Sequence, residues 1–352
     1  MPCFGSGGGG IAMSSQVRSY NEWDPLEEII IGVAVGAVFP AEARRMVEAT
    51  MPRRYWSLFE TTRPFPAQII AAAQAELDNL DRVLTEAGVV VQRPTWVDPA
   101  SLGGYTSALP RDSLLVVGSN VVEAPMAWRS RRSEALAYRP ILRHYQETGA
   151  HWVSAPQVLD HDRLVDEMPG ARWAVNETQP AFAAADFLRF GRDIVAQRSH
   201  VTNRAGIEWL RRHLGDTYRI HVLDVDNPHA MRLDCTIMPL RPGTLLFNPD
   251  WVDADTLRNS LFAEWDLVPA PRPVPREQPP LYMASDWVHM NVLVIDQERI
   301  VVEAQDDDIA DLLAGLGFDP VRCPFRNVQS IGGSFHCATT DIRRRGVLDS
   351  HL

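Results

Sequence analysis

Short predicted strands alternate with predicted helices along nearly the whole 352-residue chain, and this alternation limits the fold more than any other feature. Apolar residues recur at helical spacing from Ala67 to Glu86, and a strand, Val89–Val91, follows directly after Gly88. A helix over about Ser133–Thr148 is likewise followed by a strand, His151–Val153. This pattern favours one α/β domain of repeated units, although the units are too dissimilar in sequence to define a repeat.

No segment rich in proline, glycine or serine is long enough to divide the chain. The best candidate boundary is the proline-rich connector Pro269–Pro280, which we do not take as one. We therefore predict a single domain over residues 17–352, preceded by a flexible leader over residues 1–16 that contains four glycines in a row. The leader has no basic segment followed by a long apolar stretch, so it does not resemble a signal peptide.

Charge and cysteine content narrow the possible partners. The net charge of −11 argues against nucleic acid or an anionic membrane surface, and no apolar run is long enough to span a bilayer. The four cysteines are widely spaced and form no C-x-x-C pair, which predicts neither a disulfide framework nor a zinc site and is typical of a cytoplasmic protein. No Walker or G-x-G-x-x-G motif is present, so we expect neither a nucleotide cofactor nor a metal.

The segment Gly332–Asp341 is the strongest candidate for chemistry. Two glycines allow the backbone to approach a ligand closely, and Cys337 would be a nucleophile once ionised by a nearby base or cation. On an extended chain, His336 would point to the opposite face and would be a poor base for its neighbour. For an arbitrary Gly-Gly-x-x-x-Cys segment, a buried structural cysteine on a glycine-rich turn would be the preferred interpretation.

The chain resembles the amidinotransferase family, which includes arginine:glycine amidinotransferase and the inosamine-phosphate amidinotransferases. The resemblance runs in order from about Tyr20 to the C-terminus and rests on the segments Asn21–Glu28, Pro110–Asp112, Ala185–Asp193, Leu233–Thr236, Asn248–Asp250, Met290–Leu293 and Gly332–Gly346. It implies a five-bladed α/β propeller with the active site at the central channel.

The resemblance also implies roles for individual residues. Cys337 would attack the guanidino carbon of arginine, ornithine would leave, and an acceptor amine would take the amidine from the cysteine. Asp112 and Asp234 would bind the cationic guanidinium, while a histidine–aspartate pair would move the protons. The matching segments and their neighbourhood supply the other predicted substrate-binding residues, namely Arg111, Asp186, Ser285, Asn291 and Trp251.

Three positions depart from the family pattern. The relay aspartate belongs to a Phe-Asp-Ala-Ala segment, and Ala183 stands in its place here. The relay histidine lies two residues before the guanidinium-binding aspartate, and here that residue is Arg232, which we expect on the same face of a strand as Asp234. The family's acceptor-binding arginine follows Asn-Pro-Asp, where this chain has Trp251.

The departures change the charge of the site. Arginine is not deprotonated in proteins, so Arg232 cannot move protons as histidine does, but it can lower the pKa of Cys337. The added positive charge would weaken binding of a cationic substrate by about 1 to 4 kcal/mol, and a neutral or anionic electrophile would fit better. Alternatively, Arg232 simply neutralises Asp112 or Asp234. His289 and His229 are candidates for the missing base.

Three hypotheses follow, and we expect a small molecule as the substrate. The first is amidino transfer with rearranged proton transfer, in specialised metabolism. The second is other Cys337 chemistry, such as acyl or thioester transfer, cyclisation or hydrolysis, with Arg232 as the thiolate partner and with a substrate that is free or bound to a carrier protein. The third is a non-catalytic relative that binds a ligand or a partner. A homodimer is possible in each case, and Cys337, Arg232 and His289 are the predicted catalytic residues.

Overall fold

The computed structural model describes residues 16–165, 170–274 and 281–352. All of the predicted leader except its last residue, and the end of the connector Pro269–Pro280, lie outside these ranges. Within the described ranges, no helix combines the length and the apolar character needed to cross a membrane.

Five three-stranded sheets repeat one topology. In each sheet the middle strand pairs antiparallel with one neighbour and parallel with the other, and the parallel connection contains at least one α-helix. The sheets are β17–β1–β4 (Thr339–Arg344, Leu26–Ile31, Val90–Gln92), β5–β6–β7 (Leu114–Val117, Asn120–Glu123, His151–Ser154), β8–β9–β10 (Phe187–Phe190, Asp193–Gln197, Arg219–Leu223), β11–β12–β13 (Ile237–Arg241, Thr244–Phe247, Asp266–Pro269) and β14–β15–β16 (Leu293–Val294, Arg299–Glu303, Asp319–Cys323).

Helices connect and flank these sheets, and one small hairpin stands apart from them. The α-helices are α1 (Arg44–Thr50), α2 (Ala67–Glu86), α3 (Pro110–Ser113), α4 (Arg139–Glu147), α5 (His161–Leu164), α6 (Arg204–Leu214), α7 (Ala254–Ser260), α8 (Asp307–Gly315) and α9 (Arg326–Gln329). The 3₁₀ helices are η1 (Arg53–Phe59), η2 (Arg129–Arg131), η3 (Glu134–Ala137), η4 (Ala184–Asp186), η5 (Gly215–Thr217), η6 (Leu233–Cys235) and η7 (Asp286–Met290). The hairpin is β2–β3 (Val38–Phe39, Arg63–Pro64).

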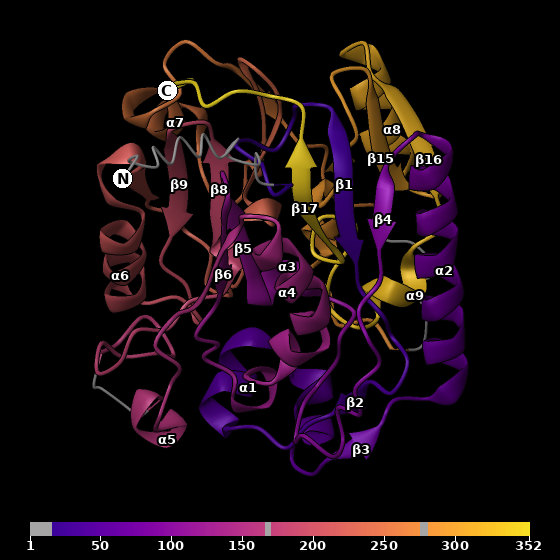
Figure 1. Ribbon diagram of the computed structural model, residues 1–352, viewed down its shortest axis with the longest axis vertical. Coiled ribbons are helices and arrows are strands. Elements are labelled where there is room, and N and C mark those ends of the chain that lie inside the picture. Colours follow the sequence, from indigo (N-terminus) through magenta and orange to yellow (C-terminus); the bar gives the residue numbers. More distant parts are fainter. Residues whose placement is uncertain (1–15, 166–169, 275–280) are drawn as a thin grey trace, which may run out of the picture.

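The repeated strand and helix units confirm the expected α/β architecture. Helices α2, α6 and α8 lie toward the outside of the molecule, whereas β1, β17, β5 and β8 lie nearer its centre (Figure 1). No sheet within the described ranges closes on itself. The arrangement of the five units as blades around a channel therefore stays a prediction.

Helical periodicity predicted the longest helix correctly. Helix α2 spans Ala67–Glu86, and its buried face consists of Ile69, Ala73, Leu77, Leu80 and Leu84. These residues recur three or four positions apart, which places them on one side of the helix and against the core. Helix α6 also begins as expected, because the Asn203 side chain accepts a hydrogen bond of 2.8 Å from the Gly206 amide.

The apolar pattern of the sequence also predicts strands over Met231–Ile237 and Trp287–Ile295, and both predictions are wrong over much of their length. The first segment contains the 3₁₀ helix η6 before β11 begins. The second begins within the 3₁₀ helix η7, and only Leu293–Val294 is extended as β14. One-turn elements have no apolar period of their own, so the surrounding apolar residues favoured strands in the prediction.

Candidate active site

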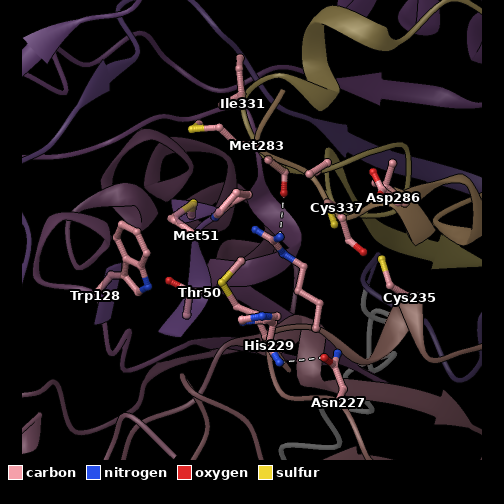
Figure 2. A pocket seen from close by; sticks show the side chains of 18 of the residues that line it. Thr50, Met51, Trp128, Asn227, His229, Cys235, Met283, Asp286, Ile331 and Cys337 are labelled. Atoms are coloured by element: carbon pink, nitrogen blue, oxygen red, sulfur yellow. Dashed lines mark hydrogen bonds between the residues drawn. The ribbon is translucent and has the colours of Figure 1, made fainter. Parts of the chain in front are cut away.

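Cys337 lies in the wall of a cavity of about 500 Å³. Figure 2 shows the Cys337 side chain beside Cys235 and Asp286, with Met51, Trp128 and His229 farther along the lining. Much of the lining is apolar or aromatic, including Met51, Trp56, Tyr105, Trp128, Met231, Trp251, Met283, Val288 and Ile331. The cavity therefore offers an apolar chamber with a thiol in its wall, the usual composition of a small-molecule site.

The glycines before Cys337 bring the backbone close to the thiol. A Cβ atom on Gly333 would lie 2.7 Å from the Cys337 Cβ and 2.8 Å from Leu109 Cδ2, which real side chains do not tolerate. Gly332 has a φ of 108°, in the region that favours glycine. The two glycines thus allow the backbone to pass close to the Cys337 thiol.

Cys337 belongs to a tight turn directly before β17 and not to an extended segment. The Ala338 amide donates to the Ser334 carbonyl at 2.8 Å, and the Thr339 amide donates to the His336 carbonyl. Because the backbone coils here, neighbouring side chains need not point to opposite faces. The prediction that His336 is turned away from the chemistry is therefore wrong.

A chain of polar contacts extends from the thiol into the protein. The Cys337 thiol lies 3.6 Å from Asp234 Oδ2, and the same oxygen is 2.7 Å from Nδ1 of His336. The Nε2 atom of His336 lies 3.3 Å from Glu22 Oε2. All four side chains are buried. Asp234 is therefore the nearest carboxylate that can take the thiol proton, and His336 holds that carboxylate in place.

Asn291 fixes the cysteine from the other side. Its Oδ1 accepts a hydrogen bond of 3.1 Å from the Cys337 amide, and its Nδ2 donates to the Cys337 sulfur at 3.2 Å. Asn291 ends η7 and is itself buried. The amide therefore sets both the backbone and the sulfur position, and it can donate to a thiolate.

Arg232 binds Asp112 and not Asp234. Its Nε and Nη2 atoms donate to the two oxygens of Asp112 at 2.6 to 3.0 Å, and its Nη1 donates to the Gly332 carbonyl at 2.7 Å. Arg131 also donates to Asp112 at 2.7 Å and forms a bidentate pair with Glu134. Burial opposes ionisation of Asp112, but the guanidinium groups of Arg232 and Arg131 lower its pKa to about 2.

The thiol is not activated in the resting structure, although Arg232 acts on its pKa in the predicted direction. Burial raises the pKa of Cys337 far above its ordinary value, and the negative charge of Asp234 raises it further. The Arg232 guanidinium does lower the pKa of Cys337, but too little to offset those two effects. Asp112 already neutralises most of that guanidinium, so the Cys337 thiol stays protonated at neutral pH.

The carboxylate next to the thiol gives a test of this electrostatic balance. In an Asp234→Asn variant the pKa of Cys337 should fall, and alkylation of the thiol by iodoacetamide at neutral pH should become about tenfold faster. The wild-type rate should keep rising with pH beyond the range of an ordinary thiol. A pH–rate profile read by peptide mass at Cys337 measures both. Asp286→Asn is the matched control, and slower alkylation in Asp234→Asn would contradict this account.

The structure does not bring all predicted site residues together. His289 lines a different cavity, where its Nε2 faces the Pro271 carbonyl at 3.0 Å and its ring stacks on Trp287. It is therefore not placed as the base for Cys337. His229 does line the Cys337 cavity, with its Nδ1 facing the Ala49 carbonyl at 3.1 Å.

The remaining predicted binding residues divide into two groups. Ser285 and Trp251 line the cavity. Asp186 and Arg111 are buried and outside the lining, and both are fully engaged. Asp186 accepts hydrogen bonds from Gln197, Ser199 and Thr202, and burial raises its pKa to about 7. Both carboxylate oxygens of Asp186 therefore already accept hydrogen bonds within the protein.

Arg111 belongs to a buried ion network behind the cysteine. Its guanidinium donates to Asp341 at 2.8 Å and to the carbonyls of His336 and Thr339. Arg189 joins the same Asp341 to Glu22 with contacts of 2.5 to 2.8 Å. A buried network of this kind holds its members in one geometry, and here it supports the turn that carries Cys337.

Sequence reasoning missed two residues of the site. His336 was visible in the motif, but it was set aside because the segment was taken as extended. Arg131, which binds Asp112 and lies over the Tyr105 ring, comes from an arginine-rich segment in which nothing marks one arginine as buried. Among the described residues, no group of three or more His, Cys, Asp or Glu side chains is placed to hold a metal ion.

Known proteins resemble this chain over nearly its whole length. No family model matches it. It is 45% identical over 356 residues to L-arginine:L-lysine amidinotransferase of Pseudomonas savastanoi pv. phaseolicola, covering 96% of this chain and 97% of that protein. It is 39% identical over 361 residues to the mitochondrial glycine amidinotransferase of Danio rerio, covering 96% and 85% respectively.

Solved structures agree with this resemblance. SxtG, an amidinotransferase of the saxitoxin biosynthetic pathway from Microseira wollei, superposes with a TM-score of 0.89 at 42% identity and covers 96% of this chain and all of that one. The inosamine-phosphate amidinotransferase StrB1 from Streptomyces griseus gives a TM-score of 0.86 at 34% identity, covering 96% and 99% respectively. The α/β fold is therefore that of these transferases, and the chain belongs to the amidinotransferase family.

Proposed function

We propose that this protein is a Cys337-dependent group transferase of specialised metabolism whose donor is an acyl thioester and not arginine. The observation that carries the proposal is the position of Arg232, whose guanidinium holds both oxygens of Asp112. By resemblance, Asp112 is one of the aspartates that would receive the guanidinium of a substrate. The chain supplies that guanidinium from its own side chain.

Charge at this position opposes a further guanidinium. Arg131 and Arg232 already lie within 3.0 Å of Asp112, so a cationic donor would add a third positive group beside the carboxylates of Asp112 and Glu134. Like charges a few ångströms apart cost about 1 to 4 kcal/mol, depending on screening. A thioester carbonyl is neutral, and an arginine near the reacting carbon can stabilise the oxyanion that forms on it.

The missing proton relay favours the same donor class. Ornithine is an amine and leaves only when protonated, which requires a group that titrates near neutral pH. Ala183 cannot titrate and Arg232 does not deprotonate in proteins. A thiolate leaves a thioester without prior protonation, because an ordinary thiol has a pKa of about 8.5. Departure of the leaving group from a thioester therefore does not require the histidine and aspartate that this chain lacks.

The reaction proceeds in two steps. The Cys337 thiol gives its proton to Asp234 while its sulfur attacks the thioester carbonyl carbon; the carbon–sulfur bond to the donor breaks, and the departing thiolate recovers the proton. The acyl group is then held as a thioester on Cys337. An acceptor amine or hydroxyl attacks this thioester and loses a proton, and Cys337 leaves as the thiolate and is reprotonated.

The lining of the cavity favours an apolar acyl group. Trp128, Trp251 and Met283 line a cavity of about 500 Å³ around the thiol, large enough for an aromatic or medium-length aliphatic group. The donor can be a free small molecule or a carrier-bound arm, since both present the same thioester.

A second candidate function is amidino transfer from arginine with a rearranged proton path. It is favoured by the 45% identity to an L-arginine:L-lysine amidinotransferase. In that case His229, which lines the cavity, would have to reach the leaving amine. Arg232 would also have to release Asp112 to make room for the substrate.

Three further expectations belong with this proposal. We propose that the five repeated sheet units surround a channel as a five-bladed propeller, since they share one topology and β17 joins β1 from the other end of the chain. We also propose that residues 17–352 form a single domain after the leader. We further propose that the protein is cytoplasmic and forms a homodimer.

Intact mass spectrometry distinguishes the candidates. The protein is incubated with the benzoyl thioester of N-acetylcysteamine or with L-arginine, alongside a Cys337→Ala variant. We expect a benzoyl adduct that is absent from the variant, with no adduct from arginine. An adduct of about 42 Da from arginine, together with ornithine release, would establish amidino transfer instead. No adduct from either donor would favour a non-catalytic relative.

A further inference from the structure

The cavity wall contains two neighbouring arginines that the proposed chemistry does not use. Arg53 and Arg54 begin η1, and both line the cavity that contains Cys337. Both side chains are exposed. Within the described ranges, neither forms a salt bridge with a carboxylate, unlike Arg131 and Arg232 deeper in the same wall.

Aromatic rings hold these guanidinium groups without neutralising them. Arg53 lies 5.9 Å from the centroid of the Trp56 ring, and Arg54 lies 4.9 Å from the centroid of Tyr55. Arg54 also donates to the Tyr282 carbonyl at 3.4 Å. Stacking on a ring leaves the N–H groups at the edge of a guanidinium free to donate, which is the usual arrangement for binding an oxyanion.

Two carboxylates also line this cavity, and they do not cancel the arginine pair. Glu48 is already paired with Arg44 at 2.6 Å. Asp286 is exposed and forms no ion pair among the described residues. The wall therefore has two unpaired cations, Arg53 and Arg54, and one unpaired anion, Asp286. In a chain with a net charge of −11, a locally positive part of a cavity wall is the exception and can attract an anionic ligand.

We propose that Arg53 and Arg54 bind the phosphate group of an acyl phosphopantetheine donor while its thioester reaches Cys337. This rests on the proposed thioester chemistry. Guanidinium forks match phosphate oxygens in a bidentate manner. The phosphate belongs either to a free coenzyme or to the arm of a carrier protein, and both place it at the same end of the donor.

Two substrates that differ only in the phosphate test the proposal. S-benzoyl-pantetheine and S-benzoyl-4′-phosphopantetheine carry the same thioester, and the ratio of their kcat/KM values measures recognition of the phosphate alone. We expect the wild-type enzyme to prefer the phosphorylated donor, and the Arg53→Ala/Arg54→Ala variant to reduce that preference about tenfold. Salt should reduce it in the wild type as well.

Charge variants sharpen the interpretation. Asp286→Asn removes the unpaired anion of the wall and should increase the preference. Arg258→Ala, an exposed arginine of α7 outside the cavity, should leave it unchanged. A preference that is absent from the wild type, or that survives Arg53→Ala/Arg54→Ala, would overturn the proposal. A benzoylated carrier protein tells the two phosphate sources apart, since a carrier is the natural donor if it exceeds the free arm in kcat/KM.

Calorimetry separates this inference from the proposed reaction. 4′-Phosphopantetheine itself is titrated into the Cys337→Ala variant, where no acyl transfer can occur. Binding that disappears when Arg53→Ala/Arg54→Ala is added supports the phosphate site even if neither thioester acylates the enzyme. Binding that is unaffected by those two substitutions overturns it, whatever the outcome of the acylation assay.

Discussion

Replacing Cys337 with alanine lowers turnover of the acyl donor by at least about a thousandfold and removes the covalent adduct. In the proposed reaction the Cys337 sulfur is the attacking atom, so its loss removes the whole nucleophilic pathway and leaves only binding and electrostatic contributions. The measurement is steady-state release of the thiol leaving group, together with intact mass after a single turnover. Folding of the variant is checked by its thermal transition, because alanine fills less of the wall next to Gly333.

Cys235 is the matched control, since it offers a second thiol in the same cavity. Burial raises the pKa of Cys235 well above its usual range, and the charges of Asp234 and Cys337 raise it further. Cys235→Ala should therefore keep the adduct. An adduct that persists in Cys337→Ala but disappears in Cys235→Ala would show that the nucleophile is Cys235 and not Cys337.

The double variant Ala183→Asp/Arg232→His gains amidino transfer from arginine. The change releases Asp112 from one of its two guanidinium partners and places a titratable histidine and a carboxylate at the positions to which the resemblance assigns proton transfer. We expect an arginine-derived adduct of about 42 Da on Cys337 and release of ornithine from the double variant, and neither from the parent protein.

The single variants serve as its controls. Arg232→His alone frees Asp112 but lacks the carboxylate that would orient the new histidine, so we expect weak arginine binding and slower transfer than in the double variant. Ala183→Asp alone should give none, because Arg232 still holds Asp112. If the parent already forms the arginine adduct, the view of Arg232 as a block to the guanidinium is wrong.

The sequence predicted the repeated α/β units, and its errors in local structure lie in one-turn elements. Helix α2 was found because twenty residues provide several turns of apolar periodicity. Element η6 is three residues long and has none. Arg232 and Asp234 were therefore assigned to one face of a strand, whereas the turn between them sends Arg232 to Asp112 and Asp234 to His336.

Long-range pairing explains the other misses. Whether an arginine meets a carboxylate more than a hundred positions away, as Arg232 meets Asp112, depends on how the sheets assemble and not on local pattern. The same holds for Asn291. The resemblance assigned it to substrate binding and did not indicate that its side chain forms hydrogen bonds with Cys337. His289 shows the reverse case, since its proximity in sequence to Asn291 did not bring it to the thiol.

The pairing of β17 with β1 has a consequence for how the protein is made. β1 is the first and β17 the last strand of the described residues, so the first sheet waits for its antiparallel partner while all the other described strands are made. Cys337 lies two residues before β17 and can reach Asn291 and Asp234 only once that segment has been made. A nascent chain that has not yet emerged through β17 therefore has no assembled Cys337 site.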